Sequence, residues 1–263
     1  MIEEILKKGK IIPIHEKNGI GSTKEAHIAK LNGKKYLLRI CQDKETAEKY
    51  KKYYNLFKKY GFFPKLIESK DNYLLFEFIN GRMCKEKEEK QIIMQIGKIC
   101  GIINKINAKN YSEREHKSFK KLDLIEKYKI ISNEKSKEIT NFYKNLSKKV
   151  KLKTSLDAGD VTNDNFMVLG KKVYFVDIEA IKPNIKGYGI AKAFTSWFKT
   201  EEERKAFTKA YNSVNSMKFY NADYHKLVTL IFFINRLKFK FEKGEKRIVK
   251  TTIKKLNKLL KEI

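Results

Sequence analysis

The chain has 263 residues, of which 41% are hydrophobic and 34% charged, and it contains 14 Tyr and 17 Phe. This composition excludes a disordered chain, and the length allows a two-lobed domain with a sizeable core. A membrane span and secretion are not expected, because no apolar run approaches the roughly 20 residues of a transmembrane helix and the N-terminus starts with acidic residues. Widely spaced cysteines and scattered histidines predict neither a disulfide framework nor a structural metal, so we expect a cytoplasmic protein.

The chain is strongly basic, with 59 Lys and Arg against 31 Asp and Glu and a net charge of +28. Such an excess suggests a polyanionic partner. Only six of the basic residues are Arg, however, whereas recognition of phosphates and base edges relies on the planar fork of Arg. Two interpretations stay open: a solvated Lys-rich surface that binds nucleic acid only through non-specific charge, and a dedicated polyanion site. In either case we expect a monomer.

The first 80 residues read mostly as strands. Short apolar or alternating runs predict strands at 11–15, 26–31 and 36–40, and Asn32-Gly33 between the last two is a strong hairpin signal. A helix is predicted next, ended by Gly61 and followed by Pro64. The predicted order is three strands, a helix and two strands, with the last three elements at 45–60, 65–69 and 73–79.

After Asn80-Gly81 the pattern becomes helical. Residues 88–107 carry isoleucines at spacings of three and four, which predicts an amphipathic helix: Ile92, Ile96, Ile99, Ile103 and Ile106. One β-hairpin interrupts this half, with strands at 166–169 and 173–176. Further helices are predicted at 122–128, 134–149, 201–214, 224–241 and 247–263.

Acidic and amide residues flank the open end of this hairpin. Antiparallel pairing brings Asn165, before the first strand, close to Asp177, after the second. Their hard oxygen atoms suit Mg²⁺, which takes few protein ligands together with substrate phosphates. Asp160, five residues before Asn165, is placed to accept a proton from a hydroxyl held near the metal.

These residues resemble those of the protein-kinase-like superfamily, in particular the aminoglycoside phosphotransferase and choline kinase group. That group carries a His-Gly-Asp-x₄-Asn loop and a later Asp, and this chain reads Ala158-Gly159-Asp160, then Asn165 and Asp177. The resemblance implies ATP as phosphate donor, Asp160 as catalytic base, and Asn165 and Asp177 as Mg²⁺ ligands. It implies an α+β, two-lobed fold, with a small antiparallel β lobe that binds ATP at 1–79 and a larger, mainly helical catalytic and acceptor lobe at 80–263.

Strand geometry and the resemblance together predict the nucleotide contacts. Between the first two strands lie small residues that let backbone N–H groups approach phosphates, namely Gly19, Gly21, Ser22 and Thr23. In the third strand, alternation puts Leu37 and Arg39 on one face, so that Leu37 lines the adenine and Arg39 reaches the phosphates. Most kinases place Lys at the position of Arg39.

Two other features complete the predicted nucleotide site. The segment 73–81 resembles the hinge between the lobes, which implies nucleotide contacts at Glu77 and Ile79. Glu48, on the helix after the third strand, is the predicted ion-pair partner of Arg39, with Glu45 as the alternative.

The chain departs from the group's pattern at three positions. The His before the catalytic Asp is replaced by Ala158, the third Gly of the phosphate loop by Lys24, and an Asp expected after the metal ligand by Gly189. In the group that His and that Asp support the catalytic loop rather than perform chemistry. Their joint loss predicts a divergent subfamily with a different brace for the loop, or alternatively a pseudokinase.

The substrate class rests on spacing and charge. The segment Ser22-Thr23-Lys24 resembles the phosphate loop of RIO-type atypical protein kinases. The roughly 80 residues between Ile79 and Asp160, however, leave room for the inserted helices of small-molecule phosphotransferases. A protein kinase and a non-catalytic nucleotide- or RNA-binding scaffold remain the alternatives. Because the residues after 180 are Lys-rich, we expect a small-molecule hydroxyl acceptor that is neutral or anionic, such as a sugar or phosphorylated metabolite, rather than a polycation.

Overall fold

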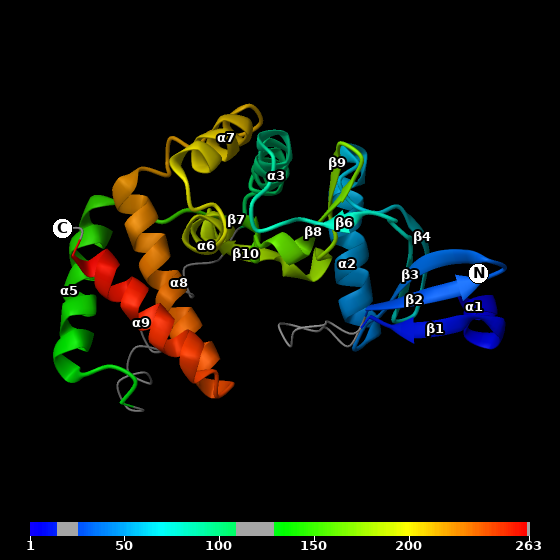
Figure 1. The fold of residues 1–263 in the computed structure, drawn as a ribbon, viewed down its shortest axis with the longest axis horizontal. Coiled ribbons are helices and arrows are strands. Elements are labelled where there is room, and N and C mark those ends of the chain that lie inside the picture. Colours follow the sequence, from blue (N-terminus) through cyan, green and yellow to red (C-terminus); the bar gives the residue numbers. More distant parts are fainter. Residues whose placement is uncertain (15–25, 109–128, 262–263) are drawn as a thin grey trace. The chain divides into compact units, whose positions relative to one another are not determined.

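The computed structural model describes residues 1–14, 26–108 and 129–261, and the chain divides into two compact units (Figure 1). The first unit comprises Met1–Glu88 together with Asn163–Ile181, and the second comprises Glu89–Thr162 together with Lys182–Ile263. The predicted α+β class with an antiparallel sheet is confirmed. The predicted boundary after residue 79, and the assignment of ATP to the first lobe, stay predictions.

The first unit is built on a five-stranded antiparallel sheet in the order β1-β2-β3-β5-β4. The turn between β2 and β3 has positive φ at Asn32 (49°) and Gly33 (74°), as the Asn-Gly hairpin signal predicts. The strands are β1 (Lys10–Pro13), β2 (Ala26–Leu31), β3 (Lys34–Ile40), β4 (Leu66–Lys70) and β5 (Tyr73–Glu77).

Two helices belong to this unit. The short helix α1 (Ile2–Lys8), absent from the sequence prediction, buries Ile2 and Ile5 in a cluster with Leu38 and Leu75 of the sheet. Helix α2 (Lys44–Phe57) begins at Asp43, whose carboxylate accepts a hydrogen bond from the Thr46 N–H at 2.7 Å. The 3₁₀ turn η1 (Lys58–Tyr60) continues it to Gly61, where φ is 67°.

The predicted hairpin, β8 (Phe166–Leu169) and β9 (Lys172–Phe175), also belongs to the first unit. Strand β8 lies between β9 and the short strand β6 (Arg82–Met83). The Phe175 N–H donates to the Phe62 carbonyl at 2.8 Å, and the rings of Phe63 and Phe166 pack near that of Phe175. Aromatic packing therefore attaches the hairpin to the segment that follows α2.

The second unit is mainly helical (Figure 1). Helix α3 packs so closely on α7 that a Cβ atom on Gly97 would lie 2.4 Å from the Phe207 carbonyl oxygen. A separate apolar cluster joins α5, α8 and α9, with Ile139, Leu230 and Leu256 completely buried. The helices are α3 (Lys90–Ile103), α5 (Asn133–Lys149), α6 (Tyr188–Ser196), α7 (Glu201–Asn212), α8 (Ala222–Glu242) and α9 (Lys246–Leu260).

Three elements around the predicted catalytic loop were absent from the sequence prediction. They are β7 (Thr154–Ala158), its partner β10 (Ile181–Ile185) and α6. The predicted helix at 122–128 lies outside the described residues. Cys41, Cys84 and Cys100 are all buried and free. Among the helices that the structure describes, none has both the length and the apolarity needed to cross a bilayer.

Candidate active site

The predicted base, Asp160, lies in the loop that follows strand β7 in the second unit. Its side chain is 43% exposed and forms an ion pair with Lys192 of α6. The Thr162 hydroxyl donates a hydrogen bond to the same carboxylate at 3.1 Å. Both partners fix the direction of the carboxylate while leaving part of it accessible, which is the arrangement that a base acting on a bound hydroxyl needs.

The loop is supported by a buried carboxylate that sequence reasoning overlooked. Asp157 of β7 is 2% exposed and accepts hydrogen bonds from the backbone N–H groups of Gly187 (3.0 Å) and Gly189 (2.8 Å) and from Asn104 Nδ2 (3.0 Å). Burial raises the pKa of Asp157, and these donors oppose that rise. Asp157 thus ties the strand before Asp160 to the start of α6 and to the end of α3.

This network accounts for the departure at Gly189. A Cβ atom on Gly189 would lie 2.8 Å from the Ala158 carbonyl oxygen and 2.9 Å from Asp157 Oδ1. Position 189, which holds Asp in the group, has no room for a side chain here, because the Asp157 carboxylate of β7 binds the backbone N–H of Gly189 on α6. The sequence predicts a different brace for the loop without naming a residue. Asp157, one residue before the position of the missing His, makes contacts that suit this role, and the role stays a prediction.

In the first unit, the hairpin brings Asn165 and Asp177 together at its open end. Phe166 pairs with Phe175, and the Val176 N–H donates to the Asn165 carbonyl at 3.0 Å. Asn165 closes the 3₁₀ turn η2 (Asn163–Asn165), and Asp177 precedes the turn η3 (Ile178–Ala180). Within the described ranges no three His, Cys, Asp or Glu side chains gather as a metal cluster. The pair nonetheless fits Mg²⁺, since one amide and one carboxylate oxygen leave most positions to phosphates and water.

The structure pairs Arg39 differently from the sequence prediction. Arg39 is 5% exposed, and its Nη1 lies 3.0 Å from Oε2 of Glu179, the acid two residues after Asp177. Tyr50 of α2 donates a hydrogen bond to the same oxygen at 3.5 Å.

Glu48, the predicted partner of Arg39, does not pair with it, so this prediction is wrong. Its side chain is 53% exposed and contacts Lys51 at 3.4 Å, and the alternative, Glu45, is also exposed. Helix α2 turns Ala47 and Tyr50 inward, so residue 48, about 100° further around the helix than residue 47, points away from the sheet.

Other predicted nucleotide contacts lie on β3, on or just after β5, or outside the described residues. Leu37 is half-buried in β3, opposite Phe76 of β5. Glu77 ends β5 and accepts the Lys65 N–H at 2.9 Å, while Ile79 is 7% exposed. The predicted phosphate loop, with Gly19, Gly21, Ser22 and Thr23, lies outside the described residues. The nucleotide roles of all these residues stay predictions.

Burial shifts the pKa values of two thiols and of one half-buried histidine. Burial, with a smaller contribution from the charge of Glu88, raises the pKa of Cys84 to about 12, and burial also raises that of Cys100. Burial, followed by the charge of Arg204, lowers the pKa of His225 to about 4. Cys84 and Cys100 are therefore protonated and the His225 imidazole is neutral at pH 7.

The fold is that of small-molecule kinases, although no family model and no curated protein matches the sequence. Choline kinase LicA from Streptococcus pneumoniae superposes with a TM-score of 0.69 at 18% identity, over 99% of this chain and 96% of its own. The chain has the protein-kinase-like fold. The ethanolamine kinase of Plasmodium vivax (TM-score 0.66, 14% identity, 98% and 83% covered) and aminoglycoside phosphotransferase APH(4)-Ia (0.68, 12%, 99% and 96%) share this kinase-like fold.

The kinase-like fold predicted from the sequence is confirmed. The roles of Asp160, Arg39, Asn165 and Asp177 stay predictions. Sequence reasoning did not point to three residues that the structure places around these candidates, namely Asp157, Glu179 and Lys192. Glu179 had a visible signal in the acidic doublet Asp177-Ile178-Glu179. Lys192 had none, because it is one of many evenly spread lysines.

Proposed function

We propose that the chain is an ATP- and Mg²⁺-dependent phosphotransferase that acts on a hydroxyl group of a small molecule. The observation that carries this proposal is the place of Asp160 in a kinase-like fold, at the end of β7, oriented by Lys192 and Thr162. The presence of Asn165 and Asp177 at one end of the following hairpin supports it, since these are the ligand types that Mg²⁺ takes.

Each residue has a definite task in this reaction. The acceptor oxygen forms a bond to the γ-phosphorus of ATP, the bond from that phosphorus to the oxygen of ADP breaks, and the hydroxyl proton goes to Asp160. Asn165 and Asp177 would hold Mg²⁺, which neutralises phosphate charge. Arg39, kept in place by Glu179, would hold phosphate oxygens through its planar fork.

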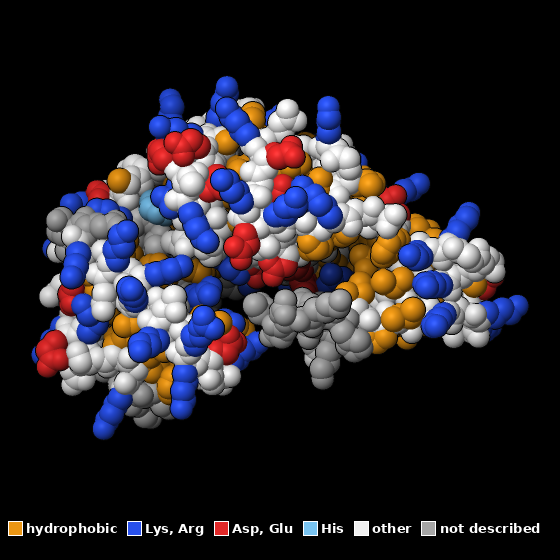
Figure 2. Space-filling view, in the orientation of Figure 1, with side chains coloured by type: hydrophobic (Ala, Val, Ile, Leu, Met, Phe, Trp, Pro, Cys, Tyr) orange, Lys and Arg blue, Asp and Glu red, His pale blue; other side chains and the backbone are white. Residues whose placement is uncertain are grey.

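Several of the structures with this fold support a small-molecule acceptor. Their names describe choline, ethanolamine and aminoglycoside kinases, and one is a ternary complex of a thermostable mutant of APH(4)-Ia with ADP and hygromycin B. Among the alternatives, these neighbours favour a metabolite kinase over a RIO-type protein kinase. On the face shown in Figure 2, Lys and Arg side chains are spread widely rather than gathered in one patch, as expected for a solvated Lys-rich surface on that face.

The test is an ATP-consumption screen with Mg²⁺ against a library of hydroxyl metabolites, with peptides and proteins as parallel acceptors. Asp160→Asn should abolish transfer while ATP affinity stays within a few-fold, because the base acts in the chemical step. Asp164→Asn, an exposed neighbour in the same segment, is the matched control and should keep its rate within a few-fold.

The metal site is tested separately. Asp177→Ala should remove Mg²⁺-dependent nucleotide binding measured by calorimetry. Unchanged affinity for Mg·ATP in that variant would contradict the hairpin assignment. Nucleotide binding without turnover of any acceptor would contradict the kinase function and favour a binding scaffold.

A further inference from the structure

A basic pocket lies in the second unit where the end of α6 meets α8 and α9. Its volume is about 350 Å³, the size of a small-metabolite site. Thr195 and Ser196 of α6 supply hydroxyl groups, and Phe232 of α8 supplies an apolar wall. Its cationic side chains are Arg236 of α8 and Arg247 and Lys255 of α9.

All described charged side chains that line this pocket are positive. Among the described residues that line it there is no Asp or Glu. Two of the six arginines of the chain occur here, although Lys is by far the commoner basic residue. Since Arg rather than Lys offers a planar fork for phosphate or carboxylate oxygens, the choice of residue indicates more than the general Lys-rich composition.

Arg236 is the more buried of the two arginines. It is half-buried, and its guanidinium lies 5.8 Å from the centre of the Phe232 ring. Burial lowers the pKa of Arg236, and the negative charges of Asp160 and Glu245 oppose this change. Within the described part of the chain, no carboxylate lies within ion-pair distance of Arg236 or Arg247. Partial desolvation of a cation without a carboxylate partner is offset when an anion binds.

The pocket is linked to the candidate base through α6. Lys192, the ion-pair partner of Asp160, is one helical turn before Thr195 and Ser196, about 4.5–6 Å along the helix axis. Lys255 donates a hydrogen bond to the Thr195 carbonyl at 3.0 Å, which holds α9 against the end of α6. A molecule seated in the pocket would therefore lie within one turn of α6 of the group that holds Asp160.

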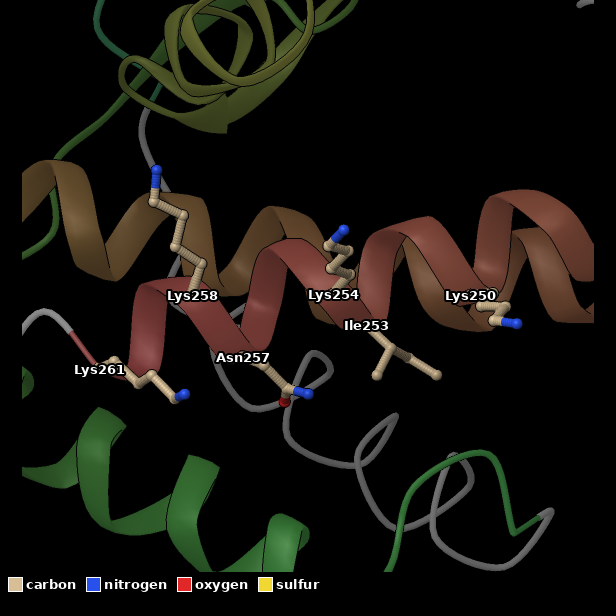
Figure 3. A pocket seen from close by; sticks show the side chains of 6 residues that line it. All are labelled: Lys250, Ile253, Lys254, Asn257, Lys258 and Lys261. Carbon is tan, nitrogen blue, oxygen red and sulfur yellow. The ribbon is translucent and has the colours of Figure 1, made fainter.

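A second concave surface on α9 lacks these features. Figure 3 shows its labelled side chains, which come from α9, among them Lys254, Asn257 and Lys258, and from the C-cap residue Lys261 that follows it. It contains no Arg and no residue of a second described element. A row of lysines on one helix is an ordinary solvated face, so we assign no ligand to it.

We propose that the pocket between α6, α8 and α9 binds an anionic group, a phosphate ester or a carboxylate, of the molecule whose hydroxyl is phosphorylated. This inference rests on the proposed function and narrows it. The acceptor would carry a negative charge as well as a free hydroxyl. Arg236 and Arg247 would hold the anion while the hydroxyl reaches Asp160.

The first test titrates inorganic phosphate into the full chain by calorimetry, without nucleotide. Arg236→Gln and Arg247→Gln should each weaken binding at least ten-fold, equivalent to about 1.4 kcal/mol. Lys246→Gln is the matched control, because it removes the same charge from the residue next to Arg247, is exposed and does not line the pocket. Phosphate binding that is absent, or that falls equally in all three variants, would overturn the proposal.

The second test compares acceptors. Three acceptors are assayed with ATP and Mg²⁺: a phosphorylated polyol, the corresponding sugar acid and the neutral parent polyol. The KM values of the two anionic acceptors show whether the pocket prefers a phosphate ester or a carboxylate. In Arg236→Gln the KM for the preferred anionic acceptor should rise at least ten-fold, and the KM for the neutral one should change less than two-fold. Arg236→Lys should recover part of the loss, because it keeps the charge without the fork.

The outcomes separate this proposal from the proposed function. Turnover of neutral and anionic acceptors with equal KM, unaffected by Arg236→Gln, would overturn the pocket's role and leave the kinase function standing. Phosphate binding that depends on Arg236, together with no ATP-dependent turnover of any hydroxyl compound, would refute the kinase function and with it the acceptor role.

Discussion

Replacing Asp157 by Asn tests whether a buried carboxylate supports the loop that carries Asp160. The two oxygens accept three hydrogen bonds from Gly187, Gly189 and Asn104. An amide keeps one oxygen and puts an NH₂ group where the other oxygen was. In either orientation, at least one backbone N–H then faces another donor in a site that is only 2% exposed.

The expected loss of stability follows from these contacts. An orphaned buried donor costs about 1–3 kcal/mol, and the remaining bonds change from charged to neutral acceptors, so the free energy of unfolding should fall by about 2–5 kcal/mol. The control is the same substitution three residues later. Asp160 is 43% exposed, and loss of its partly exposed ion pair should change stability by about 0–1 kcal/mol.

The assay is urea unfolding followed by the fluorescence of Trp197, the one tryptophan in the sequence, which directly follows α6 in the second unit. It reports on the region that Asp157 supports. A difference between Asp157→Asn and Asp160→Asn of less than about 1 kcal/mol would refute the argument. The hydrogen bonds would then be replaceable by solvent or by a shift of α6.

Three further predictions use other parts of the fold. The pKa of His225 in the folded state, about 4, lies below its ordinary value of 6.5, so neutral His225 contributes stability that is complete above about pH 6.5 and is lost as the pH falls toward 4. His225→Gln should flatten this part of the stability curve by on the order of 3 kcal/mol, and parallel urea-midpoint curves for the two proteins would contradict it. Glu179→Gln should lower kcat/KM for ATP at least ten-fold because Arg39 loses its buried partner, whereas Glu48→Gln should change it less than two-fold; the reverse order would restore Glu48 as the partner. Gly97→Ala should destabilise the second unit by about 1–3 kcal/mol through overpacking against α7, measured against the exposed Lys98→Ala, and equal melting temperatures for the two would show that α3 can shift.

The sequence predicted those helices and turns that are determined by the pattern of a few neighbouring residues. The isoleucine spacing gave the helix containing Ile92 and Ile96, and Asn32-Gly33 gave the turn between β2 and β3. These signals work because the helical period and the left-handed turn are properties of a few neighbouring residues.

Elements that depend on distant partners escaped prediction. Strand β7 buries the charged residue Asp157, and a charged residue in the middle of a short run does not indicate a buried strand. Only the tertiary structure shows the hydrogen-bond donors, on α6 and at the end of α3, that allow Asp157 to be buried. Helix α6 starts at Gly187, with φ of 85°, and has no acidic residue or side-chain cap in its first turn. Glu179 was visible as an acid after Asp177, but its partner is an arginine roughly 140 residues earlier. Such pairs are decided by tertiary packing rather than by local propensity.

The first unit is formed by two segments that are far apart in the sequence, and this matters during synthesis on the ribosome. Strand β6 pairs with β8, so Arg82 cannot form its strand pairing until Val168, roughly 85 residues later, has been synthesised. At the usual elongation rate of about 5–20 residues per second, the nascent N-terminal segment spends on the order of 4–17 seconds without its hairpin. Until then the Phe62 carbonyl and the aromatic rings beside it lack the contacts that Phe175 provides. A ribosome-stalled chain ending near residue 100 should therefore be more sensitive to proteases and more strongly bound by chaperones than one stalled beyond residue 215, which exposes the whole hairpin outside the exit tunnel.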